Sequence, residues 1–309
     1  SGRTMHGGRI GLEWQQSNRN TFGISFNGRA RAMDSEDTQV FTAEDGTGEL
    51  LRYGSQVNTS LSENFSYTGQ ITFRHKAPKE GKEWSADLTY NGWHRDSDAS
   101  FNVNSQEATG GTTPGSPSTQ QNIGGSNAGT VTFQLDVVDP MKEGTKFEYG
   151  VRSNVNLDNT WLGVHITRPG EPTERDSTLS NDFDITDIVN AVYVNWSQKL
   201  DERWSLMAGL RFEQTWYETV LLDTDQRFSY KYPDGTENLA KALFPAIYLV
   251  RRWEGTTREL QINFSRKIDR PRFWQIMPFI MFADTRNLRI GNPTLAPELS
   301  NLAEVNHLL

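Results

Sequence analysis

Residues 64–74 read NFSYTGQITFR, and this stretch alternates apolar and polar side chains with a period of two. Such alternation is typical of a β-strand with one apolar and one polar face, because successive side chains point to opposite sides of a strand. Helical spacing of apolar residues is nearly absent from the chain. The sequence therefore predicts an all-β, antiparallel fold. The same alternation recurs in five further stretches, at 21–29, 130–137, 146–155, 206–216 and 259–266.

The connections between the alternating stretches differ in length in a regular way. Short polar turns alternate with long polar segments, which places the short and the long connections at opposite ends of the strands. That asymmetry is typical of an up-and-down transmembrane β-barrel, which has tight turns on one side of the membrane and long loops on the other. The short turns are expected at 16–20, 77–83, 139–145, 199–203 and 252–257, and the long loops at about 33–49, 108–127, 159–183, 221–238 and 268–296.

Eleven strands are predicted from this pattern. Several are longer than the about 10 residues that cross the apolar layer, so we expect them to continue beyond the membrane on the long-loop side. A sheet edge cannot face lipid, and single-chain bacterial barrels have even strand numbers, so the sequence indicates part of a larger barrel. The expected strands are 7–16, 20–32, 49–76, 83–107, 127–138, 145–158, 184–199, 203–220, 238–251, 257–267 and 297–309.

Composition limits the remaining classes. The chain has 309 residues and no cysteine, and its mean hydropathy is −0.66. No window approaches the roughly 18 apolar residues of a membrane helix. Its 31 Lys and Arg are scattered among 39 Asp and Glu, for a net charge of −8. We therefore expect no nucleic-acid partner. The first ten residues lack an apolar signal core, which suits either a cytosolic protein or an exported one without its leader.

Tryptophans lie next to several of the short turns. Aromatic residues gather where the apolar layer of a membrane meets water, so this placement predicts an interfacial girdle at the short-turn end. The residues concerned are Trp84, Trp196, Trp204 and Trp253.

Two motifs near the carboxy terminus carry a family resemblance, SRKIDRP at 265–271 and GNPTLAPE at 291–298. They resemble the late barrel region of TonB-dependent outer-membrane receptors, in which the first leads into a long outer loop and the second begins the next descending strand. GLRFE at 209–213 and EYGVRSN at 148–154 fit the same pattern. The resemblance covers nearly the whole chain and is closest to the Bacteroidetes-type outer membrane protein β-barrel family.

The resemblance implies a barrel of roughly 22 strands around a plug domain. Residues 1–309 are then one partial barrel domain, without the plug and the remaining strands. The implied location is the outer membrane of a Gram-negative cell, and the implied function is import of a nutrient such as a glycan, a peptide or a metal chelate. The implied partners are outer-membrane lipid, TonB through the plug that this sequence lacks, and a surface lipoprotein.

Candidate ligand contacts are outer-loop aromatics and charges on the polar wall, because aromatic rings stack on sugars and pack on peptides or chelates. We expect Arg211 and Glu213 to pair with each other or with the plug rather than with ligand. The candidate contacts are Trp93, Arg152, Trp161, Trp216, Tyr217, Phe273 and Trp274.

No motif supports catalysis, and we predict neither an enzyme nor a cofactor. The five histidines are widely spaced, and no HExxH motif or nucleophile elbow occurs. Asp182, Asp184 and Asp187 have a spacing that could gather around calcium, but the sequence around them favours a solvated loop, so no metal site is predicted. Two alternatives remain open, a soluble β-sandwich or lectin-like binding module, and a receptor-like barrel that acts as a passive pore or a scaffold.

Overall fold

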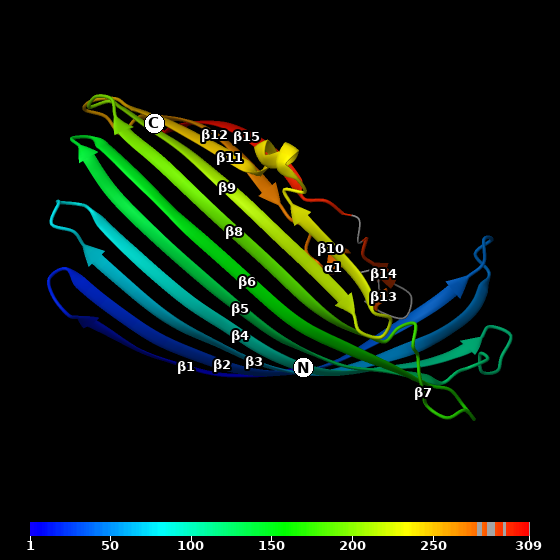
Figure 1. Ribbon diagram of the computed structural model, residues 1–309. Coiled ribbons are helices and arrows are strands. Elements are labelled where there is room, and N and C mark those ends of the chain that lie inside the picture. Colours follow the sequence, from blue (N-terminus) through cyan, green and yellow to red (C-terminus); the bar gives the residue numbers. More distant parts are fainter. Residues whose placement is uncertain (277–279, 283–287, 293–294, 309) are drawn as a thin grey trace.

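The computed structural model describes residues 1–309 apart from 277–279, 283–287, 293–294 and 309. One large antiparallel sheet dominates it, and eleven long strands follow one another through this sheet in sequence order (Figure 1). The predicted up-and-down arrangement and its eleven strands are confirmed. The strands are β1 (Gly2–Gln15), β2 (Asn20–Glu44), β3 (Leu50–Lys76), β4 (Glu83–Glu107), β5 (Ser118–Lys142), β6 (Thr145–Thr167), β8 (Asn181–Lys199), β9 (Trp204–Leu221), β11 (Leu243–Arg252), β12 (Glu259–Asp269) and β15 (Glu298–Leu308).

Shorter elements fill the long connections. β7 (Glu174–Arg175) pairs with β6, and β10 (Gln226–Tyr232) pairs with the far end of β9. A separate two-stranded sheet joins β13 (Ile280–Phe282) to β14 (Leu288–Ile290). A 3-10 helix, η1 (Thr236–Ala242), precedes β11, and one turn of helix, α1 (Phe273–Ile276), follows β12. No helix in the described part of the chain is long and apolar enough to cross a bilayer.

The long strands of the main sheet extend into three of the predicted long loops. β2 continues to Glu44, β5 already begins at Ser118 and β6 runs to Thr167, so the loop limits at 33–49, 108–127 and 159–183 were wrong. In these segments the strands stay paired through their backbones, for example between 33–44 and 50–62, and a side-chain hydrogen bond of 2.9 Å joins Ser35 to Ser60. Where neither face meets lipid, no apolar period is required on the outer face, so the pattern did not reveal these extensions.

Smaller corrections apply at the ends of other strands. β1 begins at Gly2 instead of residue 7, and β11 begins at Leu243 instead of residue 238 because η1 occupies residues 238 to 242. β15 begins at Glu298, directly after Pro297, as the GNPTLAPE motif predicts. Proline has no backbone N–H to donate to a sheet, so it suits the approach to a strand better than its interior.

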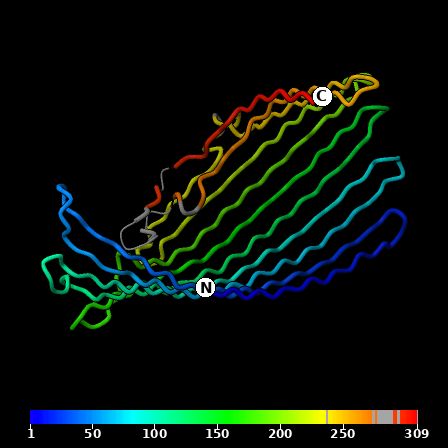
Figure 2. Tube along the Cα trace, turned by 180° about the vertical axis from the view of Figure 1, so that it is seen from behind, coloured from blue at the N-terminus to red at the C-terminus, as the bar shows by residue number. Residues whose placement is uncertain are grey.

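The short turns lie together at one end of the strands, as expected. They connect β1 to β2, β3 to β4, β5 to β6, β8 to β9 and β11 to β12. The tightest is the turn after Lys142, where Gly144 has a φ of 74°, a backbone conformation that glycine adopts without steric cost. At the other end, the extended parts of β2 to β5 project beyond their neighbours (Figures 1 and 2).

The sheet is strongly curved and open along its length (Figure 2). Within the described residues, β1 and β15 are the two margins of the strand path and are not paired with each other. Both margins expose a row of backbone hydrogen-bonding groups, which a membrane sheet must pair. The structure is therefore a barrel segment, in agreement with the predicted fold class.

Candidate ligand-binding wall

One face of the sheet, here called the outer face, is apolar across all eleven strands near the short turns. The strand register aligns these side chains, so that Ile24 lies opposite both Leu12 and Ile71. Many of them are exposed, and a contiguous exposed apolar band of this kind is expected to face lipid. A soluble β-sandwich would instead present polar side chains to water. The band includes Ile10, Leu12, Ile24, Phe26, Phe65, Tyr67, Ile71, Phe73, Leu88, Tyr90, Val131, Phe133, Val151, Val192, Val194, Leu210, Phe212, Ile247, Ile262, Phe264 and Val305.

An aromatic row borders this band at the short-turn end. Ring centroids are 5.7 Å apart for Trp14 and Phe22, 4.5 Å for Phe22 and Phe73, and 4.9 Å for Phe73 and Trp84. Across the sheet, the guanidinium of Arg251 lies 5.3 Å from the ring centre of Trp204 and 4.7 Å from that of Trp253. This arrangement matches the girdle predicted from the tryptophans beside the short turns.

The opposite face, here called the inner face, is polar and carries hydrogen bonds between side chains of neighbouring strands. Thr130 donates to Asn156 and Thr132 to Asn154, each over 2.7 Å, and Thr68 donates to Asn91 over 2.8 Å. Such ladders stiffen a sheet without apolar packing. The inner face can therefore line a water-filled passage, and it is the surface that a polar solute would meet.

The candidate ligand contacts divide between the two faces. Trp93, Arg152 and Tyr217 lie on the inner face. Trp161 and Trp216 lie within β6 and β9 instead of in outer loops, and the strand register places both on the outer face. The side chains of Phe273 and Trp274 lie outside the described residues. As ligand contacts, all of these residues remain predictions.

A buried ion cluster holds the base of the loop after β12 against the inner face. Glu213 pairs with Arg211 over 2.5 Å and also with Arg270, although only 7% of Glu213 is exposed. Arg270 also donates to the hydroxyl of Thr215 over 3.1 Å. The structure thus places Arg211 and Glu213 in a pair, as predicted, and adds Arg270 as a second cation for the same carboxylate.

Helix α1 covers the inner face beside this cluster. Ile276 packs with Phe183, Ile185 and Tyr217 in a small apolar core whose members are at most 7% exposed. The ring of Tyr230, on β10, stacks on Tyr217 with centroids 5.2 Å apart. Tyr217 is therefore a structural residue of this core, where a solute has little access to it.

Two open cavities lie on the inner face. One, of about 340 Å³, is lined by Arg152, Tyr193 and Arg211, and the Tyr193 hydroxyl donates to Asp136. The other, of about 760 Å³, lies on β1 to β4 and includes Trp93. Four arginines line the second cavity, and the sequence reading did not single them out. The sequence signal that could have identified them is the spacing of Arg29 and Arg31, which lie two residues apart on one expected strand and therefore on the same face. The four are Arg3, Arg29, Arg31 and Arg95.

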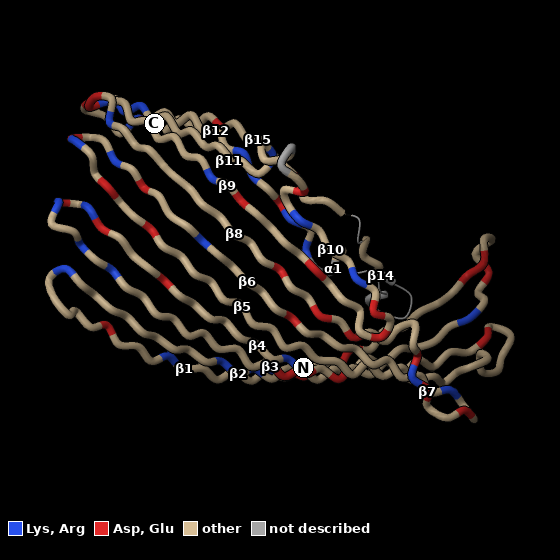
Figure 3. Tube along the Cα trace, in the orientation of Figure 1, with Lys and Arg blue, Asp and Glu red and all other residues tan. Residues whose placement is uncertain are grey.

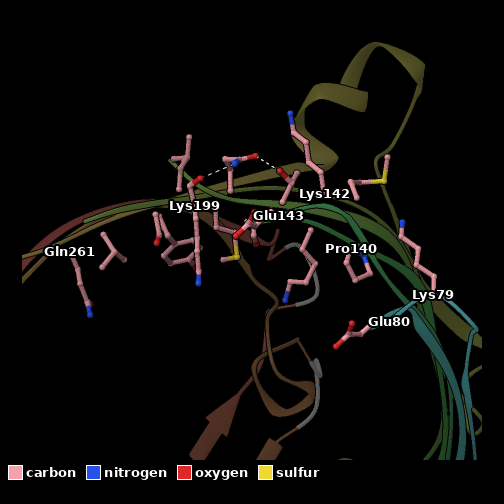
Figure 4. A pocket seen from close by; sticks show the side chains of 18 of the residues that line it. Lys79, Glu80, Pro140, Lys142, Glu143, Lys199 and Gln261 are labelled. Carbon is pink, nitrogen blue, oxygen red and sulfur yellow. Dashed lines mark hydrogen bonds between the residues drawn. The ribbon is translucent and has the colours of Figure 1, made fainter. Parts of the chain in front are cut away.

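A third cavity, of about 950 Å³, lies at the short-turn end (Figure 4). Its rim includes Lys79, and Lys199 and Gln261 extend toward the same side of the sheet. Lys79 and Lys82, in the turn after β3, bind Asp139 near the end of β5 over 2.9 and 2.7 Å. The hydrogen bond from Lys82, and then that from Lys79, lowers the pKa of Asp139 below its usual range. This ion group joins the turn after β3 to the short-turn end of β5.

The comparison with protein families agrees with this two-faced sheet. Residues 75–309 match the model of the outer membrane protein beta-barrel family. The chain belongs to this family. Its membership places the protein in the outer membrane, and the apolar outer face is then the surface in contact with lipid. A search of curated proteins gave no match.

Two solved structures resemble this outer membrane β-barrel chain at low sequence identity. The ferric citrate transporter FecA, in its unliganded form, has 12% sequence identity and a TM-score of 0.37, with 85% of this chain and 44% of FecA covered. The ferric yersiniabactin uptake receptor FyuA from Yersinia pestis has 9% identity and a TM-score of 0.35, with 99% of this chain and 50% of FyuA covered. The chain spans about half the length of these two receptors.

Proposed function

We propose that this chain is the barrel portion of a TonB-dependent receptor that imports a nutrient across the outer membrane. The observation that carries the proposal is the inner face, a polar wall on which the loop after β12 folds inward and is fixed by the Glu213 cluster. A wall of this kind suits a passage that a plug closes and a ligand enters. The SRKIDRP and GNPTLAPE motifs support the same family of receptors.

In this proposal, energy for import comes from TonB, which acts on a plug domain inside the completed barrel. A surface lipoprotein that closes the outer mouth is a further partner of the proposed receptor. The nutrient is a glycan, a peptide or a metal chelate. Catalysis has no role, and the chain contributes a wall, a ligand surface and lipid contacts.

The proposal is tested in the bacterium that encodes the protein. One strain lacks the gene for the intact protein and a second lacks TonB, and both are grown on a panel of single scarce nutrients. We expect at least one nutrient on which both strains fail and the parent grows. Normal growth of the first strain on every nutrient that the second cannot use contradicts the proposal.

The alternative of a passive pore is distinguished by conductance. The purified intact protein is inserted into a planar bilayer, where a plugged receptor carries little current until the plug is displaced. A large, steady conductance that needs neither TonB nor ligand favours a passive pore. Normal import without TonB leads to the same conclusion from the cell.

A further inference from the structure

The arginine-lined cavity on β1 to β4 contains four guanidinium groups and no acidic side chain among its lining residues. Strand register fixes their spacing. Arg31 lies opposite Met5 on one side and Asn64 on the other, and Arg95 follows in the same row beyond Asn64. Neighbouring strands are about 4.8 Å apart, so Arg31 and Arg95 start roughly 10 Å from each other.

The other members lie in the adjacent rows of the same face. Arg3 lies opposite Met33, diagonal to Arg31, and diagonal neighbours in a sheet are about 7 to 8 Å apart. Arg29 lies in the row below, followed by Ser66 and then Trp93. The four cations therefore surround a patch about 10 Å across that has an indole ring at its lower edge.

These charges are not neutralised by the described part of the chain. No carboxylate of a described residue forms an ion pair with any of the four guanidiniums, as the salt bridges in that part of the chain all involve other cations. The Nε of Arg31 is buried without a hydrogen-bond partner, while its Nη2 lies 3.2 Å from the sulfur of Met33. A buried donor that lacks a partner costs free energy, so an acceptor is expected to complete it.

The nearby acidic residues lie on the other side of the sheet. Glu63 and Asp96 are directly opposite each other in the register, and alternation along β3 and β4 puts both on the outer face. Asp96 there binds His94 over 2.9 Å. At one level the sheet thus presents carboxylates outward and guanidiniums inward, in a chain whose net charge is −8. Basic positions recur along β1 to β3 in Figure 3.

We propose that this cavity binds a polyanionic solute that carries at least two carboxylate, phosphate or sulfonate groups and a flat apolar part. The planar guanidinium group pairs with such oxyanions through two parallel hydrogen bonds, and the exposed ring of Trp93 offers a stacking surface for the apolar part. The inference rests on the proposed function only in identifying the bound solute as the imported nutrient class.

Binding is tested on the intact protein, purified from the outer membrane in detergent, without TonB. The probe is the fluorescent aromatic anion pyrene trisulfonate, followed by fluorescence anisotropy at low ionic strength. We expect saturable binding that weakens as salt rises, because screening reduces attraction between exposed charges. Competition with benzene-1,3,5-tricarboxylate and with pyrophosphate separates carboxylate from phosphate preference.

Four variants locate the site. Arg31→Gln and Arg95→Gln are each expected to raise the Kd for the probe about tenfold, as a charge-assisted hydrogen bond is lost. Arg95→Lys keeps the charge but not the two-pronged geometry and is expected to give a smaller rise. Trp93→Leu is expected to weaken binding of the aromatic probe more than that of pyrophosphate.

The matched control is Arg74→Gln, on the same strand and face as Asn64 but ten residues nearer the short turns. It is expected to leave the Kd unchanged. Equal Kd values for the parent, Arg31→Gln and Arg95→Gln overturn the inference. If the parent protein does not bind the probe but growth depends on the protein and on TonB, this site alone is rejected. If the parent binds the probe but no growth depends on TonB, only the proposed import is rejected.

Discussion

Two groups of arginines on the inner face differ in whether a carboxylate pairs with them. Arg211 and Arg270, on β9 and just after β12, share the carboxylate of Glu213. Arg31 and Arg95, on β2 and β4, meet no carboxylate in the described chain and lie in an open cavity. The sheet is equally regular in both places. The difference comes from the long connections, because one of them folds onto the inner face at β8 and β9 and none of the described residues covers β1 to β4.

This contrast separates two roles for a charge on a barrel wall. A buried pair fixes a loop at a considerable desolvation cost, so removal of one member is expensive. An exposed, unpaired cation contributes little to folding and remains available to a solute. Substitutions that distinguish the two regions therefore differ first in stability and only then in binding.

The largest effect is expected from Glu213→Ala. It leaves Arg270 and Arg211 without their shared counter-ion in a partly buried site, which typically costs about 3 to 5 kcal/mol. The measurement is the free energy of unfolding of the intact protein in lipid vesicles, from a urea titration. The control is Glu63→Ala on the exposed outer face, expected to change that energy by less than about 0.5 kcal/mol. Similar small values for both variants would show that the cluster does not hold the loop.

The next largest effect on stability is expected from a charge placed on the outer face. Ile71→Arg puts a guanidinium in the apolar band and is expected to destabilise the barrel by about 2 to 4 kcal/mol. The adjacent residue provides the control, because Gln70 is on the inner face, where its amide donates to Asp87 over 2.5 Å. In Gln70→Arg the new cation meets Asp87 and water, so the same urea titration should detect a much smaller loss. Equal losses at both positions would contradict the assignment of the two faces.

A smaller effect is expected from truncation of Ile276, which weakens the packing of α1 on the inner face at β8 and β9. Ile276→Ala removes a buried side chain that packs on Phe183 and Tyr217, at a typical cost of about 2 kcal/mol or more. Because the loss falls on α1, we expect faster hydrogen exchange at 270–276 with little change in β1 to β4. Ile10→Ala, on the outer face of β1, is the control and is expected to leave exchange at 270–276 unchanged. Unaltered exchange in Ile276→Ala would mean that the loop is held by Arg270 alone.

The sequence was sufficient for the architecture and insufficient for the site. Alternation in segments such as 64–74 predicts the strand count and the order of the faces, because lipid contact requires an unbroken apolar period on one side. Beyond the membrane that requirement ends, so the extensions of β2 and β6 to Glu44 and Thr167 need not continue the apolar period of the outer face. Trp161 lies in the extension of β6, so the sequence predicts it in a loop although it lies within the strand.

Pairing across long separations in sequence was the other information that local patterns lack. Arg31 and Arg95 belong to expected strands and the alternation puts each on the polar face, yet only the register of three strands brings them into one row. The Glu213 cluster combines both cases, since Arg211 is two residues away and Arg270 lies 57 residues along the chain. The contact of Glu213 with Arg211 was predictable from the sequence, whereas the contact with Arg270 depends on the fold of the loop after β12.

The smallest effect concerns pH and the short turns, which neither arginine group touches. The lowered pKa of Asp139, caused first by Lys82 and then by Lys79, means that its carboxylate stabilises the turns above the pKa of the unfolded chain, about 3.9. That stabilisation is lost as pH falls through the lower folded value, because the protonated acid no longer attracts the two lysines. Asp139→Asn should remove this component, so unfolding midpoints of the variant and the parent should differ slightly near pH 6 and converge as the pH falls below the lowered pKa of Asp139. A separation that persists or grows at low pH would show that Asp139 acts through the shape of its side chain instead of its charge.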